Sequence, residues 1–240
     1  MTNIAIIIPS RLDSTRLPQK PLAKIANLTM IEQVVIAAKH TPYDVYVATD
    51  SRDIANLSAQ QGAIPVMTEE HATGTERVFA ATEILGLSHD VIINLQGDMP
   101  FIEPSTIIAV ANMCQEHDYD ITTAVAKADA SYAQSLSNVK AIIDGRGKAL
   151  YFSRSMIPHN STTYLCHIGI YAFKRPALKK FCQLAHTNLE KTENLEQLRA
   201  LYHGMSIGAC IVDNMPISVD TPDDLQNARD FFTANQQQNG

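Results

Sequence analysis

Asn3-Ile4-Ala5-Ile6-Ile7-Ile8-Pro9 is a continuous run of apolar, mostly β-branched residues close to the start of the chain. Such a run is typical of a strand that is buried on both faces, as central strands of parallel α/β sheets are. Similar runs recur at residues 44–49 and 90–95. Helical stretches that begin with capping boxes, Thr29-Met30-Ile31-Glu32 and Thr73-Gly74-Thr75-Glu76, lie between them. The alternation predicts an α/β fold with a mostly parallel sheet flanked by helices.

The segment from about residue 119 to 173 has a different pattern, which predicts antiparallel strands added to the parallel core. Its short extended runs cover residues 121–125, 139–143, 149–153 and 167–173, and the turn is Asp144-Gly145-Arg146-Gly147. After it we expect a helix over about 192–203 with Gly204 as its C-cap, and then a strand over 207–212. A closing helix starts at Thr221 as the cap, with Pro222 in the first helical position.

The composition is that of an ordinary globular protein, with 45% apolar and 18% charged residues among 240. Because no linker or internal repeat divides the chain, we expect a single domain over residues 1–240. A net charge of −6 argues against nucleic acid or an anionic membrane as a partner. The first apolar run is far shorter than the roughly 20 residues of a membrane span, and no basic leader precedes it. Four scattered cysteines lack metal-ligand spacing, so we expect reduced thiols in a cytoplasmic protein.

The loop Pro9-Ser10-Arg11-Leu12-Asp13-Ser14-Thr15-Arg16-Leu17-Pro18-Gln19-Lys20-Pro21-Leu22 follows the first predicted strand. It carries three cations, Arg11, Arg16 and Lys20, at the strand end where open α/β sheets bind their ligands. Guanidinium and ammonium groups in such a place predict a site for phosphate oxygens. The other interpretation is a solvated basic loop, which the acidic charge of the whole protein disfavours. Neither a P-loop nor a dinucleotide-binding glycine motif is present, so side chains must hold the phosphates.

Two aspartates come directly after predicted strands. Asp98 lies in Asn94-Leu95-Gln96-Gly97-Asp98-Met99-Pro100, and Asp220 lies in Val219-Asp220-Thr221-Pro222. Carboxylate oxygens suit Mg²⁺, which takes one or two carboxylates and fills its shell with water and substrate phosphates. Taken alone, each aspartate is equally well explained as a turn or helix cap. Two of them beside a phosphate loop predict a metal–nucleotide site.

Two further groups have competing explanations. The stretch from Thr73 to Arg77 is explained by helix capping, although Gly74 would also let backbone groups approach a base or ribose closely. Polar residues also follow or lie on the later extended runs, among them His167. A lone histidine on a strand is more often a hydrogen-bonded structural residue than a catalytic one. The residues alone leave both questions open.

Seven motifs, in order, resemble those of the 3-deoxy-manno-octulosonate cytidylyltransferases, the CMP-Kdo synthetases of lipopolysaccharide biosynthesis. They are P-S-R-L-D-S-T-R-L-P-Q-K-P-L from Pro9, G-T-E-R from Gly74, Q-G-D-M-P from Gln96, A-L-Y-F-S-R-S-M-I-P from Ala149, H-I-G-I-Y from His167, L-E-Q-L-R from Leu195 and V-D-T-P-D-D-L from Val219. The resemblance spans nearly the whole chain. It implies a Rossmann-like nucleotidyltransferase fold, a homodimer formed through the antiparallel extension, and a sub-region at about 119–190 that holds the sugar site.

The implied reaction is Mg²⁺-dependent transfer of the cytidylyl group of CTP to 3-deoxy-D-manno-octulosonate (Kdo), which gives CMP-Kdo and diphosphate. By position, the implied catalytic residues are Arg11, Lys20 and Asp98. The implied nucleotide-binding residues are Pro9, Arg11, Ser14, Thr15, Arg16, Lys20, Thr73, Gly74, Thr75 and Arg77. The implied sugar-binding residues are Gln96, Arg154, His167, Glu196 and Gln197, and the implied Mg²⁺ ligands are Asp98 and Asp220.

Some positions depart from the family pattern. Gln19 stands where glycine is usual, Met99 where other members carry glutamate, His159 where an aromatic residue is common, and Cys166 where a basic residue is common. The Met99 side chain is no metal ligand, and the changes gather near the sugar side and the dimer ribbon. The alternatives are therefore a cytidylyltransferase for a related sugar acid, either 8-amino-Kdo or sialic acid, and a non-catalytic nucleotide sensor.

Overall fold

The computed structural model describes residues 3–14 and 16–238, which group into two compact units. We call the first the N-terminal unit; it comprises Ala5–Ser88, Asn94–Pro104 and the segment from Pro216 onward. The second, the central unit, comprises His89–Ile93, Ser105–Met215 and the chain before Ala5. The expectation of one domain stays a prediction. No helix in the described part of the chain has the length and hydropathy of a membrane span.

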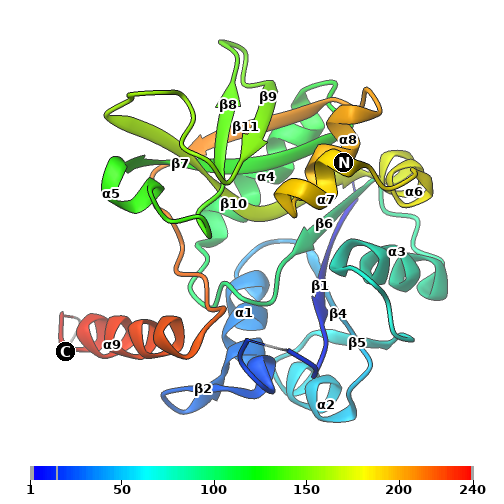
Figure 1. Ribbon diagram of the computed structural model, residues 1–240. Helices are drawn as coiled ribbons and strands as arrows, with labels where there is room; N and C mark the ends of the chain where they lie inside the picture. Colours follow the sequence, from blue (N-terminus) through cyan, green and yellow to red (C-terminus); the bar gives the residue numbers. More distant parts are fainter. Residues whose placement is uncertain (1–2, 15, 239–240) are drawn as a thin grey trace. The chain divides into compact units, whose positions relative to one another are not determined.

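Three parallel strands form the sheet of the N-terminal unit (Figure 1). They are β1 (Ile4–Ser10), β4 (Asp44–Thr49) and β5 (Ile64–Met67), with β4 in the middle. All seven residues of β1 are buried, as its continuous apolar run predicts. A further strand, β6 (Val91–Leu95), is buried throughout and leads into the second aspartate-containing turn. The parallel strands thus end where the predicted site residues follow them.

Helices make up much of the rest of the N-terminal unit. They are α1 (Met30–Lys39), α2 (Arg52–Gln60), α3 (Gly74–Leu85) and α9 (Pro222–Gln238). A 3-10 turn, η1 (Lys20–Leu22), and a small antiparallel ribbon of β2 (Lys24–Ile25) and β3 (Leu28–Thr29) precede α1. The predicted capping box of α1 is present at Thr29 and Glu32. Thr73 caps α3 by accepting from the Glu76 amide, and Thr221 accepts from the Asp224 amide at the start of α9.

An apolar cluster joins the first loop to α9. Its buried members are Leu17, Ile25, Met30, Val219, Leu225 and Ala228. Leu17 comes from the cationic loop, and Val219 immediately precedes Asp220. Burial of this cluster removes apolar surface from water, which is the main favourable contribution to folding. It therefore holds two segments about 200 residues apart against each other, directly beneath the predicted site.

The central unit has a mixed sheet. Its strands are β7 (Ile121–Asp129), β8 (Lys140–Ile143), β9 (Ala149–Ser153), β10 (Thr163–Lys174) and β11 (Ile207–Val212). The pairs β10–β7, β10–β8 and β8–β9 are antiparallel, as predicted, whereas β11 pairs with β7 in parallel. Figure 1 shows the β8–β9 hairpin extending from the rest of this unit. Its helices are α4 (Pro104–Glu116), α5 (Ala130–Ala133), α6 (Arg175–Gln183), α7 (Asn188–Glu193) and α8 (Gln197–Tyr202).

The prediction of one continuous helix over 192–203 is wrong, because the chain breaks between α7 and α8. Asn194 is left-handed, with φ 52°, and asparagine adopts this conformation more readily than most residues. The break leaves carbonyl groups at the end of α7, and the Arg154 guanidinium binds two of them, those of Glu193 and Asn194. This contact joins residues 40 positions apart, so no local pattern indicates it. Gly204 is left-handed just after α8, as its predicted role at the helix end requires.

A buried ion pair holds α7 and α8 together. The Arg199 side chain donates from Nε and Nη2 to Glu190 Oε1, at 3.1 and 2.8 Å. The guanidinium also lies 4.6 Å from the centre of the Phe181 ring of α6. Both charged side chains are almost completely buried. Each charge is tolerated there only because the other compensates it.

We expect Arg199→Met to lower the free energy of unfolding by about 3–5 kcal/mol, since it leaves the Glu190 carboxylate buried without its cation. Denaturant unfolding monitored by circular dichroism measures this change. Lys174→Met is the matched control, because it removes an exposed ion pair with Asp118 and should shift the midpoint little. Equal shifts for the two variants would contradict the structural role of the buried pair.

Candidate active site

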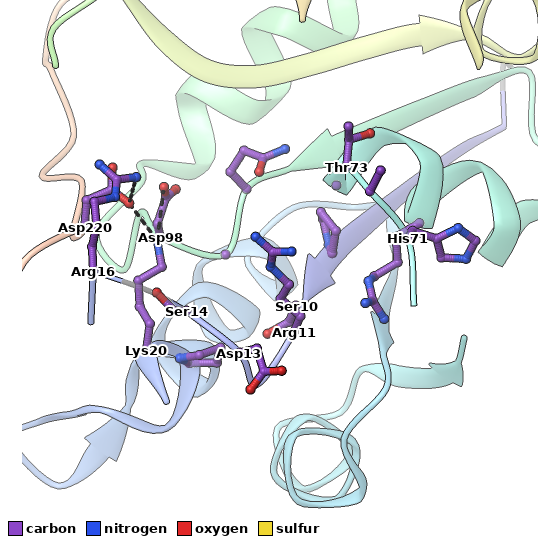
Figure 2. Close-up of a pocket in the computed structure, with 17 residues that line it drawn as sticks. Ser10, Arg11, Asp13, Ser14, Arg16, Lys20, His71, Thr73, Asp98 and Asp220 are labelled. Atoms are coloured by element: carbon purple, nitrogen blue, oxygen red, sulfur yellow. Dashed lines mark hydrogen bonds and ion pairs between the residues drawn. The ribbon is translucent and has the colours of Figure 1, made fainter. Parts of the chain in front are cut away.

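A pocket of about 320 Å³ opens at the ends of the strands in the N-terminal unit (Figure 2). Eight of the predicted nucleotide-binding residues line it: Pro9, Arg11, Ser14, Arg16, Lys20, Thr73, Gly74 and Arg77. Gln96 and both predicted metal ligands, Asp98 and Asp220, line it as well. Thr15 lies outside the described residues. The structure thus gathers four separate motifs of the sequence around one cavity.

Lys20 lies between the two aspartates on one side of this pocket (Figure 2). Its Nζ is 2.9 Å from Asp220 Oδ1 and 3.6 Å from Asp98 Oδ2. Arg16 adds a second cation, with Nη2 at 3.1 Å from the same Asp220 oxygen. A backbone hydrogen bond of 2.9 Å from the Val219 amide to the Asp98 carbonyl keeps the two carboxylate segments side by side. Two acidic groups and two cations are therefore concentrated in one place.

The Asp98 carboxylate is in an unfavourable environment for its charge. Burial raises the pKa of Asp98, the nearby Lys20 charge opposes this effect, and the Asp220 charge raises the pKa further. A divalent cation between the two carboxylates would relieve both the burial and the repulsion. A pair of carboxylates is also the protein ligand set that Mg²⁺ usually takes. The donor chemistry of Asp98 and Asp220 therefore fits the implied metal.

Two glycines allow the pocket segments to approach closely. A Cβ at Gly97 would lie 3.3 Å from the Pro9 carbonyl oxygen, and one at Gly74 would lie 3.3 Å from the Pro9 ring. Both distances are tighter than ordinary contacts, so larger residues would push these segments apart. Close packing against Pro9 thus explains why glycine is present in the G-T-E-R and Q-G-D-M-P motifs.

Thr75 and Arg77 hold the pocket wall in place through hydrogen bonds. Thr75 is buried and is not among the lining residues. Its hydroxyl accepts a hydrogen bond of 3.1 Å from the Asn94 side-chain amide. The Asn94 side-chain oxygen in turn accepts a hydrogen bond of 2.9 Å from Gln96. Arg77 donates to Asp50 at 2.6 Å and to Thr68 at 2.7 Å. Both terminal nitrogens of Arg77 are engaged in this way. These contacts fix the Gln96 amide and the end of β4, and the prediction that Thr75 and Arg77 contact the nucleotide stays untested.

The other predicted sugar-binding residues belong to the central unit. The Arg154 guanidinium donates to the carbonyls of Leu136, Glu193 and Asn194, at 2.9, 2.8 and 3.2 Å. The Glu193 carboxylate accepts from the Arg154 amide and from Ser153. Arg154 thus binds the chain just before Glu196, the N-cap of α8, and Gln197, the first residue of that helix. The side-chain amide nitrogen of Gln197 is buried without a hydrogen-bond partner among the described residues.

His167 is a neutral, hydrogen-bonded histidine in this unit. Its Nε2 lies 2.9 Å from Thr123 Oγ1, and its ring contacts those of Phe152 and Tyr171. Burial lowers the pKa of His167 to about 3, so the ring carries no charge at neutral pH. Burial also raises the pKa of Tyr171, and the Glu196 charge adds to this effect. His167, Tyr171 and Glu196 therefore form one neighbourhood, in which Tyr171 is a polar group that the site prediction did not include.

Comparisons with known proteins identify the family of this chain. The family model described as Cytidylyltransferase matches residues 5–207. A protein of Rickettsia felis named 3-deoxy-manno-octulosonate cytidylyltransferase is 48% identical over 234 residues, which cover 96% of this chain and 95% of that protein. The chain belongs to the 3-deoxy-manno-octulosonate cytidylyltransferase family. A relative of the same name from Rickettsia bellii is 47% identical over the same share of this chain.

Solved structures show the nucleotidyltransferase fold of this cytidylyltransferase. A CMP:2-keto-3-deoxy-manno-octonic acid synthetase complexed with CTP superposes with a TM-score of 0.91 at 34% identity, covering 98% of this chain and 100% of that one. A cytidylyltransferase from Leptospira borgpetersenii superposes with a TM-score of 0.62 at 14% identity, covering 99% and 96%. The second likeness concerns the fold alone. The predicted family and fold class are confirmed.

Two departures from the family pattern have a structural explanation in this cytidylyltransferase. Gln19 adopts a left-handed conformation, φ 53° and ψ 34°, immediately before Lys20. Glycine reaches this region without strain, which accounts for its usual presence at this position. Met99 is buried, with 3% of its surface exposed, so it contributes packing where other members carry a carboxylate.

Sequence reasoning missed several polar residues of the pocket and its surroundings. Ser10, Asp13 and His71 line the pocket. Ser10 and Asp13 lie within the first motif and His71 lies two residues before Thr73, which was the available signal. In the central unit, Lys140 is completely buried, and its ammonium group donates to the carbonyls of Ser135, Asn138 and Arg154. No local pattern indicates this contact, because a lysine is usually exposed.

The raised pKa of Asp98 predicts that Asp98→Asn stabilises the protein without ligands at neutral pH. When a carboxyl pKa is higher in the folded than in the unfolded state, ionisation favours the unfolded state. The variant should therefore gain a few degrees in Tm at pH 7, and the gain should vanish below the ordinary carboxyl pKa of about 4. Differential scanning fluorimetry across this pH range measures the difference. The exposed Glu69→Gln is the control, and a variant that is less stable than wild type at pH 7 would overturn the assignment.

Proposed function

We propose that this protein transfers the cytidylyl group of CTP to Kdo, with release of diphosphate. The observation that carries the proposal is the pocket in which Arg11, Arg16 and Lys20 meet Asp98 and Asp220. The names of the relatives and the CTP complex of the similar structure support the choice of substrates. Nucleotidyl transfer depends mainly on positioning and on neutralisation of charge, and this pocket offers both.

In the proposed complex, the three cations bind the triphosphate. Arg11 and Arg16 present pairs of N–H donors to phosphate oxygens, and Lys20 places a compact charge beside the two aspartates. Diphosphate is the leaving group, so cations that bind its oxygens stabilise the charge that accumulates as the bond to the α-phosphorus breaks. Arg11, Lys20 and Asp98 are therefore the proposed catalytic residues.

Asp98 and Asp220 would hold Mg²⁺ in the working enzyme. When bound, the ion neutralises the α-phosphate and acidifies the attacking hydroxyl group of the sugar. Lys20 already balances the same two carboxylates, so its ammonium group is positioned to turn to the phosphates when the ion binds. The protein residues thus bring the charges together and require no side chain as a general base.

The sugar acid would bind through the remaining predicted residues, Gln96, Arg154, His167, Glu196 and Gln197. Its carboxylate requires a cation, and Arg154 retains N–H groups beyond the three that bind carbonyls. His167, being neutral, would contribute a hydrogen bond rather than a charge. The anomeric hydroxyl would then attack the α-phosphorus in line with the departing diphosphate.

The wider assignments belong to the same proposal. Activated Kdo is the donor for lipopolysaccharide synthesis, and we infer that the enzyme acts there, in the cytoplasm. We also infer a homodimer formed through the antiparallel part of the central unit. Leu150 of β9 and Ile211 of β11 are each 54% exposed, and covering such apolar surface favours association.

The test of this function is diphosphate release from CTP and Mg²⁺ in the presence of Kdo, with parallel reactions containing 8-amino-Kdo and N-acetylneuraminate. We expect turnover with Kdo and loss of at least a hundredfold in Asp98→Ala, because the metal site then has one carboxylate. Turnover with only one of the other sugar acids would mean that this acid is the substrate, and the proposed reaction type would stand. CTP binding without turnover on any of the three would favour the nucleotide sensor.

Arg154→Met should raise the KM for Kdo about 10- to 100-fold, as expected for loss of a charge-assisted hydrogen bond. The KM for CTP should change little. Steady-state kinetics with each substrate varied in turn separate the two effects. Arg146→Met, in the exposed turn of the β8–β9 hairpin, is the control. An unchanged KM for Kdo in the Arg154 variant would remove this residue from the carboxylate site.

A further inference from the structure

Ser10, the last residue of β1, has a side-chain oxygen that is buried without a hydrogen-bond partner among the described residues. The residue exposes only 6% of its surface. Other buried hydroxyls of the N-terminal unit are satisfied: Ser58 donates to the Ile54 carbonyl at 2.7 Å, and Thr41 to that of Ala38 at 2.7 Å. A buried polar group that lacks a partner destabilises the fold, so such groups are uncommon and call for an explanation.

The position of Ser10 suggests one. It lines the pocket proposed for CTP, and Figure 2 shows it beside Arg11, between the aspartate side and His71. In the sheet, Ser10 is level with Thr49 of β4. The residue that follows β4 is Asp50, which binds Arg77. Ser10 therefore adjoins the wall of Thr73 and Arg77, where the nucleoside is expected, rather than the Lys20–Asp98–Asp220 group.

We propose that the Ser10 hydroxyl hydrogen-bonds the nucleoside half of CTP, which makes Ser10 a nucleotide-binding residue. This inference rests on the proposed function. Serine has three staggered rotamers about χ1 and loses little on changing between them, so the hydroxyl can turn from its closed position toward a bound ligand. A hydroxyl both donates and accepts, which suits the carbonyl, ring nitrogen and hydroxyl groups of a pyrimidine nucleoside.

The gain in binding free energy from this hydrogen bond would exceed the strength of the bond itself. In the free protein the hydroxyl is removed from water and receives no hydrogen bond in return. A ligand that supplies the missing partner relieves this cost. Removal of the hydroxyl should therefore weaken binding while leaving the free protein at least as stable as before.

The experiment is a calorimetric titration of Ser10→Ala and wild type with CTP and with CMP. We expect the Kd of both nucleotides to rise about 3- to 10-fold, because the loss of one hydrogen bond is the same for each. Ser10→Cys, which keeps the approximate shape and donates weakly, should show a similar loss. Tm of the free Ser10→Ala protein should equal or exceed that of wild type, whereas Ser58→Ala, the matched control, should lower Tm and leave both affinities unchanged.

An unchanged Kd for CTP in Ser10→Ala would overturn the proposal. A loss of affinity for CTP without a loss of affinity for CMP would also overturn it, because that result would indicate a contact with the phosphates. The titration needs no sugar and no turnover. A wild-type protein that binds CTP yet releases no diphosphate with any sugar acid would contradict the proposed function and would leave the Ser10 comparison valid. A wild-type protein that binds neither nucleotide would overturn both.

Discussion

The N-terminal unit depends on one electrostatic arrangement, the position of Lys20 against Asp98 and Asp220. These residues come from the first loop, the turn after β6 and the segment before α9, so the arrangement joins three distant parts of the chain. Two carboxylates this close repel each other unless a cation is shared between them. The apolar cluster that includes Leu17 and Val219 supplies the packing that holds these segments in place. Packing and charge therefore support the same geometry.

Around this arrangement, the wall of the pocket is held by hydrogen bonds among polar side chains. The series from Thr75 through Asn94 to Gln96 is an example, because each hydroxyl or amide satisfies the next and fixes its direction. Arg77 does the same between Asp50 and Thr68. Such buried networks are costly when incomplete, so they favour a single arrangement of the wall. The pocket is consequently shaped before any ligand binds.

The parts of this protein that follow from local pattern were predictable from sequence. The run of buried residues in β1, the caps at Thr29, Thr73 and Thr221, and the position of Asp98 after β6 all follow from periodicity, capping chemistry and the geometry of parallel strands. The prediction that Asp220 directly follows a strand is wrong, because β11 ends at Val212 and residues 213–220 form no strand. The contacts that depend on distant partners were not predictable in this way. The break at Asn194 is stabilised by Arg154, 40 residues away, and Thr75 turned out to face Asn94 rather than the pocket. Motifs in the sequence identified the site residues, whereas the contacts that hold these residues in place became visible only in the structure.

The left-handed conformation of Gln19 has a consequence for how this loop can change during evolution. A non-glycine residue in this region carries a cost of about 1–2 kcal/mol in the folded protein. A glycine would avoid that cost but would give the unfolded chain more freedom, which typically lowers stability by about 0.4–1 kcal/mol. The first effect is the larger, so glycine is favoured at this position by up to about 1.5 kcal/mol. Exchange of Gln19 for glycine is therefore an available stabilising change, provided that the backbone keeps the same turn.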